Sequence, residues 1–307
     1  MKKISIIGAG NVGASIAQLL LSKGGYDILL LDIVEGIPQG KALDLFHAIP
    51  LYQRGGTISG SNDFSKMQNS EIIVITAGLP RKPGMSRDDL LEKNTSIIRS
   101  VCQHIKQHAP DSIVIVVTNP LDTMTLVAQK TLGFPPKRVM GMAGTLDSAR
   151  FKAFLAAELS ISPDKIETLV LGGHGDAMVP LPEFTKIDGK PITALLDKEK
   201  MEELVNRTRN AGAEIVSHLK TGSAFYAPAA AVVEMIEQME NDEGTIVPVT
   251  AYLNSEFGYD GICLGVPVKL GKEGIKEVVE LPLSEEAKRL LDVSAKAVIE
   301  NKEKLGF

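Results

Sequence analysis

The fold of this chain is decided by Lys3-Ile4-Ser5-Ile6-Ile7, followed at once by Gly8-Ala9-Gly10-Asn11-Val12-Gly13. The first run predicts a buried strand, and apolar residues at helical spacing over 12–22 predict a helix. The glycines between them have the G-x-G-x-x-G spacing. Gly8 permits a tight turn, Gly10 lets the backbone approach a pyrophosphate, and Gly13 allows close packing of helix on strand. The segment therefore predicts a strand–turn–helix unit that binds a dinucleotide at the positive end of the helix.

Asp32 follows the next predicted strand, 27–31, and lies about twenty residues beyond the motif. A carboxylate at this place accepts a hydrogen bond from the ribose 2′-hydroxyl and repels a 2′-phosphate, which favours NAD over NADP. FAD is bound with similar geometry and is the main competitor. The other alternative is a structural turn beside an ordinary strand-end aspartate.

The first half of the chain alternates short β-branched runs with helical patterns, which is typical of a parallel sheet covered on both faces. Strands are predicted at 3–7, 27–31, 57–59, 72–76, 112–117 and 138–140. A long helix is expected over 87–108, with Ser86 as its N-cap and Asp89 as the capping-box partner. We therefore expect an α/β fold whose N-terminal part is a Rossmann doubly wound parallel sheet.

The second half segregates its elements instead of alternating them. Helices are expected near 145–159, 198–219, 224–239 and 285–304, and strands near 245–253, 262–270 and 278–281, with a turn at Asp188-Gly189. This order predicts a C-terminal mixed α+β substrate domain. No linker composition marks the junction, and we expect an NAD-binding domain at 1–143 and a catalytic domain at 144–307.

Composition excludes several classes of protein. The 307 residues are 44% hydrophobic, with 38 acidic against 33 basic side chains and no Lys/Arg block, which argues against a nucleic-acid partner. The two cysteines, Cys102 and Cys263, are too few for a disulfide framework and favour a reducing cytosol. The apolar runs are too short to span a bilayer, and the start resembles no signal peptide. We expect a cytoplasmic enzyme without a membrane partner. Because the sequence has no clustered metal-ligand motif, we also expect no metal.

A histidine flanked by glycines is the candidate acid–base group. Gly172-Gly173-His174-Gly175-Asp176 follows a strand-like run, and the small neighbours leave the imidazole unshielded. Imidazole exchanges a proton near neutral pH, so His174 is the candidate general base. The alternative is a structural histidine, but the other four histidines have no comparable surroundings.

Asp147 and Arg150 are three residues apart on a predicted helix, hence on one face. They could form a surface ion pair. Alternatively, Asp147 orients His174 while Arg150 binds a substrate carboxylate in bidentate fashion.

Two further features surround the end of the fourth strand. Residues 79–87 are predicted to form a basic loop bounded by Pro and Gly, which contains Arg81, Lys82 and Arg87. The loop follows the carboxyl end of a strand, which is the edge of an open α/β sheet where ligands bind. It is either a solvated loop or a lid over an anion. Asn94 occupies a position of the following helix where a leucine would be expected, and either a cofactor or a backbone contact could satisfy its amide.

These segments together resemble the lactate/malate dehydrogenase family nearly from end to end. The resemblance rests on the six-residue glycine motif, Leu31–Ile33, Ala77–Leu91, Val117–Asp122, Gly144–Phe151, Gly172–Leu181 and Lys220–Ala231. More narrowly, the chain is similar to the bacterial malate dehydrogenases whose sequences look like those of lactate dehydrogenases. The family implies NAD as cofactor and homo-oligomers, either dimers or tetramers.

The resemblance also implies a role for each matching position. His174 would be the proton acceptor and Asp147 its orienting carboxylate. Arg150 would hold the C1 carboxylate, Arg87 and Asn119 would polarise the carbonyl oxygen, and Arg81 would face the variable end of the substrate. Val117, Thr118 and Asn119 would lie along the nicotinamide ribose, Asn94 would belong to the cofactor site, Ser223 would line the pocket, and Asn119-Pro120 would be cis.

These implied roles describe reversible oxidation of malate to oxaloacetate. The nearest alternative is a lactate dehydrogenase, which differs in the group that meets the substrate tail. A remoter alternative is a non-catalytic NAD-binding sensor, which would keep the glycine motif and Asp32 but could lose His174 or Arg150.

Overall fold

The N-terminal sheet is built around the predicted glycine motif. The structure, a computed structural model, describes residues 1–80 and 86–307, except for the side chain of Arg87. Its six parallel strands lie in the spatial order β3-β2-β1-β4-β5-β6. They are β1 (Lys2–Ile7), β2 (Tyr26–Leu31), β3 (Thr57–Ser61), β4 (Ile72–Ile75), β5 (Ile113–Val116) and β6 (Val139–Gly141). The predicted Rossmann sheet is confirmed, with strand ends moved by one or two residues.

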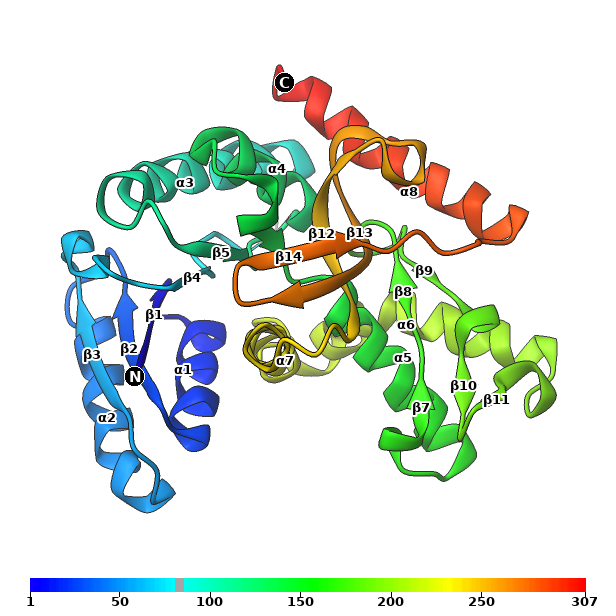
Figure 1. The fold of residues 1–307 in the computed structure, drawn as a ribbon, viewed down its shortest axis with the longest axis horizontal. Helices are drawn as coiled ribbons and strands as arrows, with labels where there is room; N and C mark the ends of the chain where they lie inside the picture. The colour runs from blue at the N-terminus through cyan, green and yellow to red at the C-terminus, as the bar shows by residue number, and fades with distance from the viewer. Residues whose placement is uncertain (81–85) are drawn as a thin grey trace.

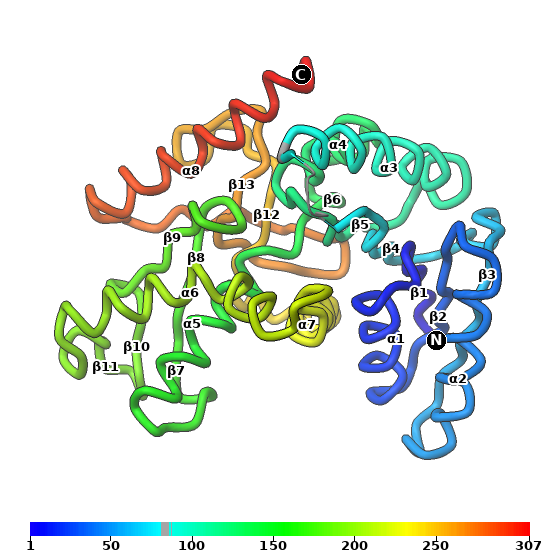
Figure 2. Tube along the Cα trace, turned by 180° about the vertical axis from the view of Figure 1, so that it is seen from behind, coloured from blue at the N-terminus to red at the C-terminus, as the bar shows by residue number. Residues whose placement is uncertain are grey.

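Helices cover both faces of this sheet, as β-branched strands buried on two sides require. One face packs on α1 (Asn11–Lys23), α2 (Ile37–Tyr52) and α7 (Tyr226–Asn241), and the other on α3 (Arg87–His108) and α4 (Leu121–Leu132). Figures 1 and 2 show α3 and α4 on the side of the sheet opposite α1 and α7. The capping box of α3 is confirmed, because Ser86 Oγ accepts from the Asp89 N–H and the Asp89 carboxylate accepts from the Ser86 N–H.

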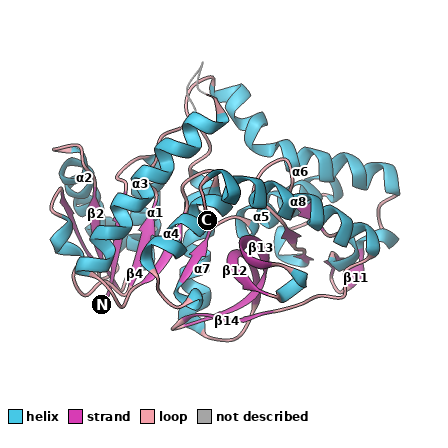
Figure 3. Cartoon of the chain, turned by 90° about the horizontal axis from the view of Figure 1, so that it is seen from above, coloured by secondary structure: helices cyan, strands magenta, loops and turns pink. Residues whose placement is uncertain are grey.

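The second half extends the same sheet, which the sequence pattern does not predict. Strands β12 (Ile246–Asn254), β13 (Asp260–Gly271) and β14 (Gly274–Val278) form an antiparallel meander. Thr250 of β12 pairs with Gly141 of β6, so one sheet of nine strands runs through the described residues of both halves. Figure 3 shows this meander beside the parallel strands.

The predicted strand at 278–281 is wrong. The edge strand β14 ends at Val278, where that prediction begins. Lys276 and Glu277 are consecutive and both exposed, so this edge strand lacks the continuous or alternating apolar pattern that would mark it in the sequence.

The remaining elements form a lobe around α5 (Gly144–Leu159), α6 (Lys198–Leu219) and α8 (Glu285–Lys304). A small core centred on Phe151 packs α5 and α6 against short strands. These strands are β7 (Ile166–Glu167), β8 (Val170–Leu171), β9 (Val179–Pro180), β10 (Lys186–Ile187) and β11 (Lys190–Pro191). The turn at Asp188-Gly189 is confirmed, with positive φ at both residues. No helix in the described part of the chain is long and apolar enough to cross a membrane.

Candidate active site

The glycine turn lies where the strand order reverses, between β1 and β4, the place where doubly wound sheets bind ligands. Gly8 has φ +107°, which L side chains rarely adopt. A Cβ on Gly13 would lie 2.0 Å from the Gly8 carbonyl oxygen, whereas a Cβ on Gly10 would meet no atom within 4 Å. The turn is therefore closed on the strand side and open on the outer side, at the N-terminus of α1.

Asp32 stands directly after β2 and closes the glycine turn. Its carboxylate accepts hydrogen bonds from the backbone N–H of Ala9, at 2.8 Å, and of Val34, at 3.0 Å. Each oxygen keeps a further lone pair, so the carboxylate can also accept from a hydroxyl. The predicted neighbourhood of Asp32 and the glycine motif is thus present.

The loop after β5 supplies the next wall of the site. The Asn119-Pro120 peptide is cis, as predicted, and Val117 and Asn119 line a cavity. Thr118 points elsewhere, because its hydroxyl is buried and donates to the Ala77 carbonyl at 2.6 Å. Only the backbone of Thr118 can therefore serve a ligand.

Asn94 has backbone partners, one of the alternatives that the sequence left open. Its Oδ1 accepts from the Leu79 N–H at 2.8 Å, and its Nδ2 donates to the carbonyls of Leu79, at 3.2 Å, and Asn119, at 2.7 Å. Both amide hydrogens are thereby used. In this structure Asn94 ties the loop after β4 to the loop after β5, and a cofactor contact stays a prediction.

His174 and Asp147 meet at the centre of the site, although they come from different elements. Asp147 lies in the first turn of α5, and His174 lies in the turn between β8 and β9. The Nδ1–H of His174 donates to Asp147 Oδ2 at 2.9 Å, which leaves Nε2 as the ring nitrogen that can accept a proton. Burial of the imidazole opposes its charged form, but the adjacent Asp147 carboxylate outweighs this, and the pKa of His174 is raised.

Arg150 lies one turn further along α5. Its Nη1 is 3.3 Å from Asp147 Oδ1, and the Asp147 side chain is only 2% exposed, so this is not a surface ion pair. The Arg150 Nε is buried and has no hydrogen-bond partner in the described part of the chain. A buried donor of this kind calls for an acceptor, and a carboxylate is the natural one for guanidinium.

These groups surround a cavity of about 340 Å³. Its wall joins the cofactor side, through Val12, Val117 and Asn119, to the catalytic side, through Arg150 and His174. Ser223 lines it, as predicted. The cavity lining also includes residues that the sequence did not single out, among them Met142 and Arg209. Arg209 belongs to a helix rich in exposed charges, so no sequence signal separates it from its neighbours.

Two predicted substrate contacts lie outside the described residues. Arg81 belongs to the segment 81–85, and the side chain of Arg87 is likewise outside the description. The segment begins just after Leu79, which Asn94 holds, and α3 begins at Arg87. The predicted lid over an anion therefore stays a prediction.

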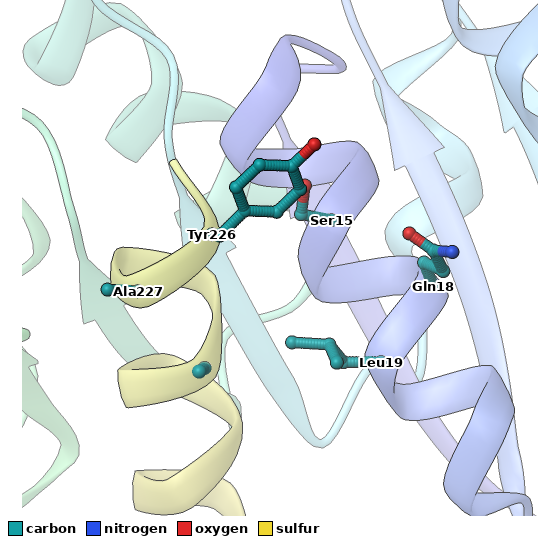
Figure 4. Close-up of a pocket in the computed structure, with 6 residues that line it drawn as sticks. Ser15, Gln18, Leu19, Tyr226 and Ala227 are labelled. Atoms are coloured by element: carbon teal, nitrogen blue, oxygen red, sulfur yellow. The ribbon is translucent and has the colours of Figure 1, made fainter. Parts of the chain in front are cut away.

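A second hollow lies between α1 and α7, apart from the histidine (Figure 4). Figure 4 shows the Tyr226 ring of α7 beside Ser15 of α1, with Gln18 and Leu19 further along the same helix. None of the residues lining it carries a formal charge. It offers no acid–base pair, unlike the cavity at His174.

Comparison with known proteins agrees with this geometry. The family described as lactate/malate dehydrogenase, NAD binding domain, matches residues 2–141, and the lactate/malate dehydrogenase alpha/beta C-terminal domain matches residues 144–306. A malate dehydrogenase of Heliobacterium modesticaldum is 54% identical, over 97% of this chain and 96% of that protein. A malate dehydrogenase of Chlorobium limicola is also 54% identical, over 97% of each chain.

Solved structures give the same result. The malate dehydrogenase of Cryptosporidium parvum superposes with a TM-score of 0.96 at 41% identity, covering 99% of this chain and 98% of that one. A lactate dehydrogenase of the same organism, complexed with lactic acid and nicotinamide adenine dinucleotide, has a TM-score of 0.95 at 38% identity, covering 99% of this chain and 98% of that one. On these matches, the chain belongs to the lactate/malate dehydrogenase family.

Proposed function

We propose that this chain catalyses the reversible NAD-dependent oxidation of (S)-malate to oxaloacetate. The observation that carries the proposal is a cavity that joins the Asp147-bound His174 to the walls Val12, Val117 and Asn119. The same cavity is lined by Arg150, whose buried Nε has no partner among the described residues. The relatives at about half identity are malate dehydrogenases, which favours malate over lactate.

The residues after β1 fit NAD. The N-cap of α1 is Gly10, which makes no side-chain capping bond, and a Cβ there would point into open space. A diphosphate placed on this helix end would accept from its unpaired N–H groups. Asp32, beside the turn, has lone pairs for the adenosine ribose and carries the charge that disfavours a 2′-phosphate.

We assign the proton transfer to His174. Bound NAD supplies the acceptor for the hydride that leaves the C2 carbon of malate. His174 Nε2 takes the proton of the C2 hydroxyl, and the resulting imidazolium donates to Asp147 through Nδ1–H. In the reverse direction the imidazolium returns that proton to the carbonyl oxygen. Asp147 is buried, so its charge is poorly screened and stabilises the cationic form of His174.

We assign the substrate carboxylate at C1 to Arg150. Its guanidinium is already aligned by Asp147 at 3.3 Å, and its buried Nε has no acceptor in residues 1–80 and 86–307 as the structure describes them. A carboxylate would supply that acceptor and give the bidentate geometry that arginine favours. By the family resemblance, Asn119 and Arg87 bind the C2 oxygen.

Arg81 is proposed as the residue that selects malate. Malate and oxaloacetate end in a second carboxylate, whereas lactate and pyruvate end in a methyl group that would leave a guanidinium unpaired. An unpaired buried charge costs about 3–5 kcal/mol, and each ~1.36 kcal/mol is tenfold in rate. We expect wild-type kcat/KM to favour oxaloacetate over pyruvate by about a hundredfold or more.

The test compares both substrates on wild type and on Arg81→Gln. This variant should lower kcat/KM for oxaloacetate by at least about tenfold, through loss of a charge-assisted contact, and raise it for pyruvate. Because both substrates are measured on one variant, general damage to the loop cancels. An unchanged ratio would remove Arg81 as the selector, and wild-type preference for pyruvate would overturn the malate assignment.

We also propose that the protein is a cytoplasmic homo-oligomer, a dimer or tetramer. Two exposed apolar side chains of α2, Leu43 at 57% and Phe46 at 55%, support a partner surface. Sedimentation velocity would report a monomer if this is wrong.

A further inference from the structure

A buried carboxylate stands behind the catalytic turn, and the reaction proposed above does not use it. Asp122 belongs to α4, a helix whose described side chains are almost all buried, and is 6% exposed. It lies in the segment Val117–Asp122, which carries the family resemblance but gives Asp122 no role. A carboxyl group in such surroundings needs hydrogen-bond partners that compensate for its lost hydration.

Both oxygens of Asp122 have partners. Oδ2 accepts from the backbone N–H of His174 at 2.8 Å, and Oδ1 lies 2.8 Å from the hydroxyl of Thr250 in β12. One side chain therefore joins α4, β12 and the turn that carries the imidazole. No cation within the described part of the chain forms an ion pair with it.

The turn itself has few other supports. Gly172 has φ +80° and Gly175 has φ +121°, so flexible residues flank the histidine on both sides. Besides Asp122, the Gly173 N–H donates to Ser294 Oγ at 2.6 Å, and the Gly172 N–H donates to the Gly265 carbonyl at 2.8 Å. Of these bonds, only the one from Asp122 is made to the histidine residue itself.

We propose that Asp122 is a positioning residue that holds the backbone of His174, through a hydrogen bond from its N–H, so that the imidazole ring meets Asp147. The inference rests on the proposed role of His174. Asp122 is the acceptor in both of its contacts, because Oδ2 accepts from the His174 N–H and Oδ1 accepts from the Thr250 hydroxyl. Burial raises the pKa of Asp122, although these two hydrogen bonds favour its charged form.

The proposal distinguishes an isosteric substitution of Asp122 from one that truncates the side chain. Asp122→Asn retains an acceptor for the His174 N–H and a donor for Thr250, but it cannot carry a charge. Asp122→Ala removes the acceptor. Thr125→Val is the matched control, since Thr125 lies on the same helix, is fully buried, and within the described residues its hydroxyl bonds only to the Leu121 carbonyl of its own helix.

The measurement is kcat and kcat/KM against pH for the 2-hydroxy acid that wild type turns over. Asp122→Ala is expected to lower kcat by about ten- to a hundredfold through misplacement of the base, with the dissociation constant for NADH unchanged. The pH midpoint of its turnover should fall toward the ordinary pKa of histidine, because Asp147 no longer holds the ring. Asp122→Asn should keep kcat within about threefold of wild type and lower the midpoint less than Asp122→Ala does, because both variants lose the charge but only Asn keeps the ring against Asp147.

The midpoint reflects every charged group near the imidazole. Among the described residues these are Asp147 and Arg150 on α5, Asp122 on α4, Arg209 on α6 and Asp176 in the turn itself. All except Asp122 are the same in the variants, so the comparison isolates this one side chain.

Three results would overturn the proposal. Equal losses in Asp122→Asn and Asp122→Ala would show that a hydrogen-bond acceptor at this position does not suffice, and equal losses in Asp122→Ala and Thr125→Val would show general destabilisation. Wild-type kinetics in Asp122→Ala would show no role. If Asp122→Ala does not fold, Thr250→Val provides the test by freeing the other oxygen of Asp122: an unchanged kcat there contradicts the proposal, and a fall of about two- to fivefold supports it. Substrate preference of wild type tests the proposed function separately.

Discussion

The raised pKa of His174 has a direct kinetic consequence. Oxidation of malate needs the neutral imidazole, so kcat/KM for malate should rise with pH through a midpoint above the ordinary value of about 6.5. Reduction of oxaloacetate needs the imidazolium and should fall over the same range. Asp147→Asn should move both midpoints down, because the charge that favours imidazolium is removed. His174→Asn, expected to lose about 10² to 10⁴ in turnover, is the control. Identical midpoints in wild type and Asp147→Asn would contradict this assignment.

Asp32 is expected to determine the choice between NADH and NADPH. Asp32→Ala should weaken the binding of NADH and reduce the discrimination against NADPH, because the acceptor for the ribose hydroxyl and the charge that repels a 2′-phosphate are lost together. The variant also loses the bond from Ala9 N–H, so some loss of stability is expected. Fluorescence titration of both coenzymes measures the effect, and an unchanged affinity ratio would refute the role.

At the scale of elements, the role of the glycine motif can be tested at the contact between β1 and α1. Gly13→Ala should displace α1, because the added Cβ would lie 2.0 Å from the rigid backbone oxygen of Gly8. Overpacking of this kind costs about 1–3 kcal/mol, and the shifted helix end should also bind NADH more weakly.

Gly40→Ala is the matched control, since Gly40 lies in α2 and its added Cβ meets nothing within 4 Å. It should be neutral or stabilising by up to about 1 kcal/mol. Thermal unfolding of the two variants decides the matter: equal melting temperatures would mean that the Gly13 contact is not restrictive.

At the scale of the whole molecule, the continuous sheet predicts that the two halves unfold together. The pairing of Thr250 with Gly141 joins them, and one hydrophobic core contains Leu20 of α1 as well as Val249 of β12. Calorimetry should show one transition, which NADH at a hundred times its dissociation constant stabilises by about 2.7 kcal/mol. Two transitions, of which NADH moves only one, would instead support independent domains at 1–143 and 144–307, a division that stays a prediction.

Local sequence determined the elements whose cause is local. The glycine turn, the capping box of Ser86 and Asp89, and the helices with a strong apolar stripe follow from backbone sterics and nearby hydrogen bonds. The predicted range of the edge strand β14 was wrong, because this strand is stabilised by pairing with its neighbour β13 and not by its own composition.

The residues of the candidate site were predicted from the sequence, but only the tertiary structure decided which of them touch. Asp147 and His174 are 27 residues apart, and neither pattern alone shows that they lie 2.9 Å from each other. Asp122 meets His174 across 52 residues, and the amide of Asn94 has backbone partners, one of the two alternatives that the sequence left open. Such contacts depend on long-range packing, which brings together strand ends and turns from both halves of the chain. Residue type and spacing therefore determined which chemistry is present, and the folded sheet decided which groups touch.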